Sequence, residues 1–205
     1  MKERLGSMQN SMKKIIAITG GIGSGKSCAL KILSENGFNT ISCDQVVSFL
    51  YKKHGVKKIL KRIFPTAVSG KLLLKIDRKK ISSLAFNDDA LHSALTNAIT
   101  PLVLKEVLKR AKTIKGNVFV EVPLLFECGY QDKFDKVLII YRDKNSRIES
   151  VKSRSNLSEQ EILARMAKQF DYDNNNLSSF TLINNDQTLT ELKEKVLSFA
   201  NSINY

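Results

Sequence analysis

Eight residues near the N-terminus carry the clearest chemical signal in the sequence. Residues 20–27 read Gly-Gly-Ile-Gly-Ser-Gly-Lys-Ser and match the pattern G-x-x-x-x-G-K-[S/T]. An apolar run of strand length, residues 14–19, precedes them, and helical spacing follows over residues 28–36. In that context the glycines let successive N–H groups face a chain of phosphates, and the next helix adds its positive end. The pattern predicts a phosphate-binding loop (P-loop) for a nucleoside triphosphate.

The residue types of this loop predict individual roles. Lys26 is expected to bridge the β- and γ-phosphates, and the Ser27 hydroxyl is expected to hold Mg²⁺. Cys28 is expected to contribute only its backbone N–H. The predicted phosphate-binding residues are Gly21, Gly23, Ser24, Gly25, Lys26, Ser27 and Cys28.

Two carboxylates lie at the carboxyl ends of strand candidates. In parallel sheets, ligands bind at this end of the strands. Asp44 closes the candidate strand that begins at residue 38, and it suits either a base that takes a proton from an acceptor hydroxyl or a helix N-cap. Glu121 ends the candidate strand 117–122 and suits either a magnesium-bound water or acceptor group, or a structural pair with a core cation. The residues alone leave both pairs of alternatives open.

A polar helical stretch, residues 142–176, contains many cations. A hinged cationic flap would exclude water and neutralise the charge of a phosphoryl-transfer transition state. The alternative is a solvated helix face, and we expect only one or two of these cations to touch phosphate. They are Arg142, Lys144, Arg147, Lys152, Arg154, Arg165 and Lys168.

The elements that must position these residues alternate between strand and helix. Nearly continuous apolar strands at 14–19, 38–42, 117–122, 136–141 and 180–183, with a closing helix at 189–200, predict an α/β fold whose parallel sheet is covered by helices on both faces. Residues 46–115 contain no convincing strand. The predicted division is a core (13–45, 116–141 and 177–205), a helical insertion (46–115) and a helical lid (142–176), after a polar extension (1–12) expected to be disordered.

Composition narrows the class of protein and of partner. The 205 residues lack an apolar run of membrane-spanning length and a signal peptide, and three scattered cysteines do not make a disulfide framework or a zinc site, so we expect a cytoplasmic protein. The net charge is +13, and residues 51–80 hold 11 Lys or Arg against one acid. Because only Tyr51 and Phe64 interleave these cations, a small anionic ligand is favoured over single-stranded nucleic acid.

Three segments together resemble the dephospho-coenzyme A kinases: residues 19–27, the Asp44 segment, and Val-Pro-Leu-Leu-Phe-Glu at 122–127. The resemblance runs from about Lys13 to the C-terminus and also includes residues 76–86. It implies a P-loop kinase with a helical insertion that binds the acceptor and with a lid. It also implies transfer of the γ-phosphate of ATP to the ribose 3′-hydroxyl of dephospho-coenzyme A. The alternatives are a P-loop kinase for another nucleotide or sugar and, more remotely, a nucleic-acid-binding P-loop ATPase.

The resemblance also implies roles for single residues. Asp44 would be the catalytic base, assisted by Lys26 and by the lid arginine Arg154, while Asn184 would contact ATP. Contacts to the acceptor are expected from Arg78 and Glu121. The expected partners are ATP, Mg²⁺ and dephospho-coenzyme A, without nucleic acid or membrane, in a monomer or weak homo-oligomer.

The chain departs from the family pattern at several positions. Where the family has a first acid before Asp44, this chain has Ser42, and a second lid arginine is replaced by Ser150. A histidine before a long helix is replaced by Thr100, a P-loop threonine by Cys28, and a basic residue expected near Asn175 is absent.

Overall fold

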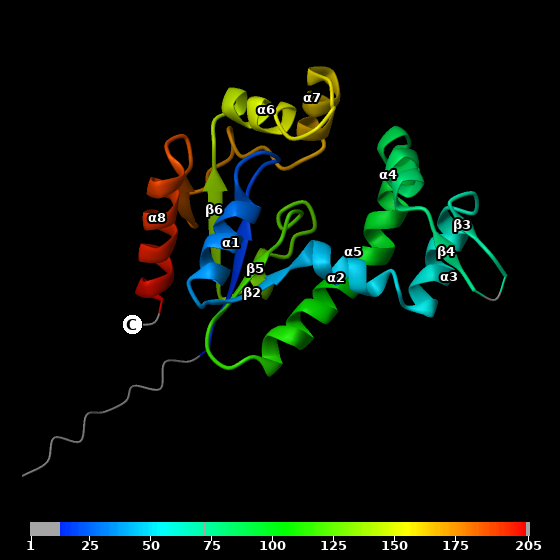
Figure 1. Cartoon of the computed structure of the whole chain (residues 1–205), viewed down its shortest axis with the longest axis horizontal. Coiled ribbons are helices and arrows are strands. Elements are labelled where there is room, and N and C mark those ends of the chain that lie inside the picture. Colours follow the sequence, from blue (N-terminus) through cyan, green and yellow to red (C-terminus); the bar gives the residue numbers. More distant parts are fainter. Residues whose placement is uncertain (1–12, 72, 204–205) are drawn as a thin grey trace, which may run out of the picture.

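The computed structural model describes residues 13–71 and 73–203, so the predicted extension at 1–12 lies outside the described part. A five-stranded sheet in the order β2-β5-β1-β6-β7 forms the centre, and all its neighbouring strands are parallel (Figure 1). This confirms the predicted α/β fold. The strands are β1 (Ile15–Thr19), β2 (Asn39–Ser42), β5 (Val118–Glu121), β6 (Lys136–Tyr141) and β7 (Thr181–Asn184).

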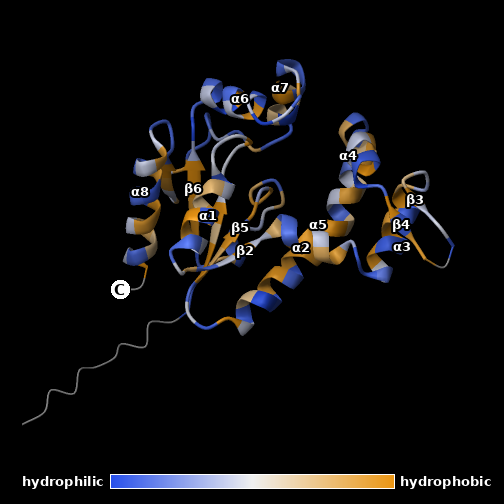
Figure 2. Cartoon of the chain, viewed as in Figure 1, coloured by the Kyte–Doolittle hydropathy of each residue, from blue (hydrophilic) through white to orange (hydrophobic). Residues whose placement is uncertain are grey.

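Helices cover both faces of the sheet because its strands are apolar on both sides. Ile16 and Ile18 of β1 pack in one core with α1 (Lys26–Glu35) and α8 (Leu189–Ser202). Ala17, between them, belongs to a second core that includes α5 (Asp89–Thr113). Figure 2 shows the central strands as mostly hydrophobic, whereas helices such as α6 and α8 alternate between hydrophilic and hydrophobic residues.

The insertion between β2 and β5 contains two short strands that the sequence did not predict. Its helices are α2 (Cys43–Leu50), α3 (His54–Ile63), α4 (Arg78–Asn87) and α5, and Asp77 caps α4 as predicted by accepting a hydrogen bond from the Lys80 N–H at 3.0 Å. The expectation of no strand is wrong, because β3 (Val68–Ser69) and β4 (Lys75–Ile76) pair as an antiparallel hairpin. Two-residue strands are too short to show alternation, and burial of Val68 and Leu74 stabilises this pair instead.

A short 3₁₀ turn, η1 (Gln131–Lys133), precedes β6. The predicted lid region, which follows β6, forms two short helices, α6 (Lys144–Lys152) and α7 (Glu159–Ala167). Ile148, Val151 and Ile162 give these helices a small core of their own. Figure 1 shows α6 and α7 beyond the carboxyl ends of the strands, on the side of the loop between β1 and α1. The helices therefore lie at the same edge of the sheet as that loop, and their role as a lid stays a prediction.

Candidate active site

The loop between β1 and α1 has the backbone geometry that a phosphate cradle requires. Gly23 and Gly25 have φ values of 81° and 102°, which residues with a Cβ rarely adopt. Gly25 is the N-cap of α1, so the unpaired N–H groups of that helix start at Lys26. Gly21, Gly23 and Ser24 are buried, and the loop is packed on its outer side by Arg147: a Cβ at Gly21 would lie 2.2 Å from a guanidinium nitrogen.

Lys26 is buried within this loop. Its Nζ donates hydrogen bonds to the carbonyl oxygens of Gly20 at 2.7 Å and Gly21 at 2.8 Å. Burial lowers the pKa of Lys26 from 10.5 to about 8, although the carboxylates of Glu121 and Glu127 partly oppose that shift. A cation held at low solvation interacts strongly with any phosphate that reaches it.

Ser27 and Glu121 form a direct pair at the carboxyl end of the sheet. The Ser27 hydroxyl donates to Glu121 Oε1 at 2.6 Å, and Glu121, only 5% exposed, ends β5 beside β1. A hydroxyl next to a carboxylate is a donor set that suits Mg²⁺, which keeps several waters and takes its remaining ligands from phosphates. Glu121 therefore lies against the residue that is predicted to hold Mg²⁺, and its contact with a magnesium-bound water or with an acceptor group stays a prediction.

A cavity of about 320 Å³ opens over the loop and α1. Its lining contains three cations, Lys26, Arg142 and Arg154, and no acidic residue of the described part. Ser27, Cys28, Gly23 and Gly25 complete the floor. We call this the P-loop cavity, and its charge suits a polyanion such as a triphosphate.

Asn185, rather than the predicted Asn184, reaches the P-loop. Asn185 lines the P-loop cavity and its Nδ2 donates to the Ser24 carbonyl at 2.8 Å. Asn184 ends β7, and its side chain instead accepts a hydrogen bond from the Asp186 N–H at 3.0 Å. Two adjacent asparagines are indistinguishable from sequence until the end of the strand fixes which one points to the loop.

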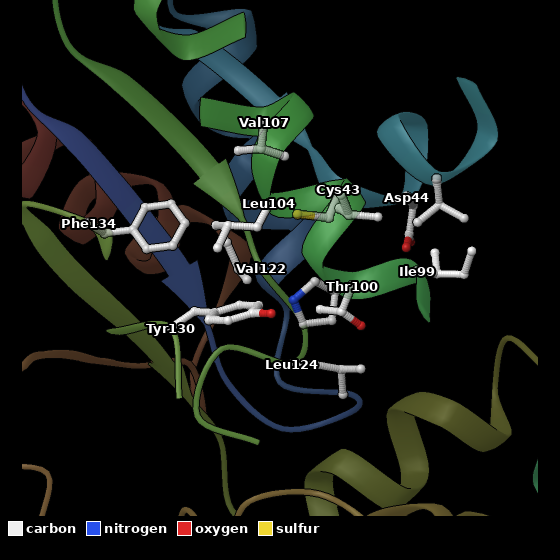
Figure 3. A pocket seen from close by; sticks show the side chains of 13 residues that line it. Cys43, Asp44, Ile99, Thr100, Leu104, Val107, Val122, Leu124, Tyr130 and Phe134 are labelled. Atoms are coloured by element: carbon white, nitrogen blue, oxygen red, sulfur yellow. The ribbon is translucent and has the colours of Figure 1, made fainter. Parts of the chain in front are cut away.

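Asp44 lies in the first turn of α2, beside a second cavity of about 170 Å³ (Figure 3). Ser42 occupies the N-cap position, so Asp44 is not the N-cap of this helix. The carboxylate is exposed and makes no hydrogen bond with the described residues. Because Ser42 is in register with Glu121, and Glu121 with Ile18, Asp44 is positioned two strands from the P-loop strand.

The lining of this second cavity is almost entirely apolar, and we call it the apolar cavity. Thr100, Tyr130 and Asp44 supply the side-chain oxygen atoms of this lining, and Figure 3 shows Asp44 on the side of the cavity away from Tyr130. Cys43 also lines it, and burial, followed by the charges of Asp44 and Glu121, raises the pKa of this thiol to about 12. That pKa disfavours a reactive thiolate, so Cys43 serves as a small buried residue.

A third cavity of about 570 Å³ separates the insertion from the lid, and we call it the insertion–lid cavity. Arg78, Arg165 and Lys168 line it, together with Glu127, Tyr51 and His92. It shares Val47 and Leu124 with the apolar cavity, so the two are neighbours. Arg78, a predicted acceptor contact, is held there by hydrogen bonds to the Ser48 hydroxyl and carbonyl at 3.0 and 3.2 Å.

The cations of residues 142–168 divide into groups with different surroundings. Arg142 and Arg154 line the P-loop cavity, while Arg165 and Lys168 line the insertion–lid cavity. Arg147 is buried and pairs with Asp173 at 2.6 Å. Lys152 forms a surface pair with Glu159, which matches the solvated alternative.

Sequence reasoning missed the contacts that the segment after α7 makes with the P-loop. Gln169 Oε1 accepts the Ile22 N–H at 2.7 Å, and the hydroxyls of Tyr172 and Thr19 lie 3.1 Å apart. These residues are about 150 positions apart in sequence, and no local pattern connects them.

The comparisons with known proteins agree with this geometry. A model of a protein family described as dephospho-CoA kinase matches residues 14–191. A dephospho-CoA kinase from Helicobacter pylori is 32% identical over 94% of this chain and 98% of that protein. Among solved structures, TT1252 from Thermus thermophilus aligns with a TM-score of 0.78 and 29% identity over 93% of this chain and 97% of that chain. A dephospho-CoA kinase from Campylobacter jejuni aligns with a TM-score of 0.68 and 26% identity, covering 94% and 98%.

Proposed function

The chain belongs to the dephospho-CoA kinase family, and we propose that it transfers the γ-phosphate of ATP to the ribose 3′-hydroxyl of dephospho-CoA, giving CoA and ADP. One observation carries the proposal within the structure. The cationic P-loop cavity and the free carboxylate of Asp44 lie at the same edge of one sheet, where a triphosphate and a hydroxyl must meet.

Asp44 is proposed as the base of the reaction. The acceptor oxygen forms a bond to the γ-phosphorus, the bond from that phosphorus to the β–γ bridging oxygen breaks, and the acceptor proton passes to the Asp44 carboxylate. The exposure of this carboxylate supports the assignment, since the acceptor hydroxyl needs an open path to it.

Lys26 and Arg154 are proposed to stabilise the charge of the transferred group. Lys26 is close enough to the P-loop carbonyls to exchange them for phosphate oxygens, and Arg154 faces the same cavity from the lid side. Fixed cations at the oxygens that gain charge lower the barrier without reorganisation of solvent. Asn185 is proposed to hold the loop by its contact with Ser24.

Mg²⁺ is proposed as the cofactor, with Ser27 as the residue that holds it and Glu121 as the group that orients a magnesium-bound water. When bound, Mg²⁺ would neutralise negative charge on the leaving group. Within residues 13–71 and 73–203, no group of three or more His, Cys, Asp or Glu side chains is placed so that it could hold a metal ion.

We further propose a cytoplasmic protein, active as a monomer or weak homo-oligomer, which needs neither nucleic acid nor membrane. Its three free cysteines, Cys28, Cys43 and Cys128, suit a reducing compartment. No helix of the described residues is long and apolar enough to cross a membrane. The division into core, acceptor-binding insertion and lid is part of the same proposal.

Release of ADP tests the reaction directly. We expect ADP to form from ATP and Mg²⁺ when dephospho-CoA is present, with only background hydrolysis when it is omitted. Coupled detection of ADP, with the 3′-phosphorylated product identified by mass, is the measurement. A panel of other hydroxyl acceptors serves as control, and ADP formation with one of them but not with dephospho-CoA would exclude the proposed substrate.

Loss of the Ser27 hydroxyl should change the requirement for metal. In Ser27→Ala we expect the Mg²⁺ concentration for half-maximal activity to rise about tenfold, because one oxygen ligand is lost while the triphosphate ligands remain. The measurement is a Mg²⁺ titration of ADP release at saturating ATP. Ser34→Ala, an exposed serine later in α1, is the matched control. An unchanged Mg²⁺ dependence in Ser27→Ala would contradict the assignment.

A further inference from the structure

Residues 165–173, which we call the bridging segment, contact both the insertion and the P-loop. In Figure 1 the chain leaves α7 and runs over the loop between β1 and α1. We propose that Gln169 is a positioning residue through which occupancy of the acceptor site and binding of the nucleotide are coupled. The inference rests on the proposed function, because it takes dephospho-CoA as the acceptor.

The first link joins Gln169 to the P-loop. Its Oε1 accepts the Ile22 N–H at 2.7 Å and so sets the orientation of the third peptide of the loop. The neighbouring glycines leave no room for that peptide to move outward, since a Cβ at Gly23 would lie 2.5 Å from the Arg147 carbonyl oxygen. Arg147 in turn is held by Asp173, within the bridging segment. The direction of the loop N–H groups therefore depends on where this segment lies.

The second link joins the same segment to the insertion. The Lys168 Nζ donates to Asp89 Oδ1 at 2.7 Å and to the Phe86 carbonyl at 3.1 Å. The Arg165 guanidinium lies 4.9 Å from the centre of the Phe86 ring. The pair of Lys168 with Asp89 is exposed and weak by itself, but it adds to the contacts with Phe86.

The third link is the insertion–lid cavity itself. Gln169, Lys168 and Arg165 all line it, beside Glu127, whose Oε1 accepts the Phe170 N–H at 3.0 Å. An acceptor bound in this cavity therefore contacts the bridging segment, which also holds the P-loop through Gln169. When the acceptor fixes the position of the bridging segment, it favours the P-loop conformation that binds phosphates, and ATP then binds more tightly. Because such coupling is reciprocal, ATP must tighten acceptor binding by the same factor.

Equilibrium binding tests this coupling without turnover. The full-length protein is titrated with a non-hydrolysable β,γ-imido analogue of ATP, with and without saturating dephospho-CoA. We expect the acceptor to tighten analogue binding about fivefold or more in the unsubstituted protein. We call the ratio of the Kd of the analogue without dephospho-CoA to its Kd with dephospho-CoA the coupling factor. In Gln169→Met, which keeps the length of the side chain but not its acceptor oxygen, we expect this factor to fall close to one.

Three further variants separate positioning from loss of structure. Gln169→Glu keeps an oxygen for the Ile22 N–H, so it should bind the analogue less tightly in both states yet retain the factor. Lys168→Met interrupts the link to the insertion and should also reduce the factor. Asn185→Ala weakens the P-loop contact at Ser24 outside the insertion–lid cavity, so it should weaken analogue binding without changing the factor.

Two results would overturn the inference: a factor of one in the unsubstituted protein, or an unchanged factor in Gln169→Met. A protein that shows the coupling but forms no CoA would instead contradict the proposed function. The two failures are therefore distinguishable.

Discussion

Asp44→Asn should reduce turnover with dephospho-CoA by about 10²- to 10⁴-fold while ATP still binds. Asparagine has nearly the same shape as aspartate, but its amide cannot take a proton from the acceptor hydroxyl. The N-cap of α2 is Ser42, and the Asp44 carboxylate makes no hydrogen bond with the described residues, so its replacement removes no structural contact that they provide. The measurement pairs the kcat for ADP release with the Kd of a non-hydrolysable ATP analogue.

A control must separate proton transfer from the electrostatic effect of an acid in the first turn of a helix. Glu191→Gln removes such an acid from α8, where Glu191 forms a surface pair with Lys195 and accepts a hydrogen bond from the Thr188 hydroxyl at 3.5 Å, and it lines none of the three cavities. We expect this control to keep normal turnover. If Asp44→Asn also kept near-normal turnover, the base would have to be another group.

The parts of the site that the sequence could predict are those that depend on residues close to one another in the sequence. The P-loop, its strand and its helix occupy consecutive positions, and the turn from β1 into α1 needs glycines such as Gly25. Parallel strands were predictable because apolar runs with intervening helices permit few other arrangements. Asp44 was found because it follows a strand whose carboxyl end lies at the same edge of the sheet as that of the P-loop strand, although β5 separates the two strands.

The parts that the sequence could not predict depend on contacts between distant residues. Ile22 and Gln169 are joined only by the fold, and the choice of Asn185 over Asn184 depends on where β7 ends. The β3–β4 hairpin forms because α3 covers it, and its strands are too short for periodicity to show.

The strong charge of residues 51–80 has a more local explanation than the sequence suggested. Arg78 is the only cation of this stretch that lines a cavity described above. Lys57 and Lys61 donate to the carbonyls of Leu74 and Gly70 in the hairpin, at 2.8 and 2.7 Å. Some of these cations therefore stabilise the insertion itself, and most of the cations that line the cavities belong to residues 142–168.

Two of the departures from the family pattern, Ser150 and Thr100, line cavities of the structure. Ser150 lines the P-loop cavity, so the replacement of a lid arginine there removes a cation from its wall, where Arg142 and Arg154 remain. Thr100 lines the apolar cavity beside Asp44, which places this departure next to the proposed base. The effects of the two departures should differ, the first on nucleotide affinity and the second on the acceptor.

Lys26→Met should reduce turnover by about 10²- to 10³-fold or more, because it removes a buried cation from the phosphate site while keeping the length of the side chain. It should also weaken binding of the ATP analogue, unlike Asp44→Asn. Lys31→Met, an exposed lysine on the same helix, is the matched control and should be neutral. Equal analogue affinity in Lys26→Met and the unsubstituted protein would contradict the role of Lys26.

The pH dependence gives Lys26 a second, independent signature. Burial lowers its pKa to about 8 in the folded protein against 10.5 ordinarily, so the unfolded chain binds more protons between these values. Stability rises with pH wherever the unfolded state binds more protons, and the free energy of unfolding of the unsubstituted protein should therefore increase relative to Lys26→Met from pH 8 to 10.5.

Over the same pH range Lys26 loses the charge that meets phosphate, so kcat/KM for ATP should fall as pH rises through about 8. Chemical unfolding of both proteins across this range and initial rates at low ATP are the measurements. A constant difference in unfolding free energy, or a kcat/KM that is flat through pH 8, would show that the buried ammonium does not titrate as the geometry requires.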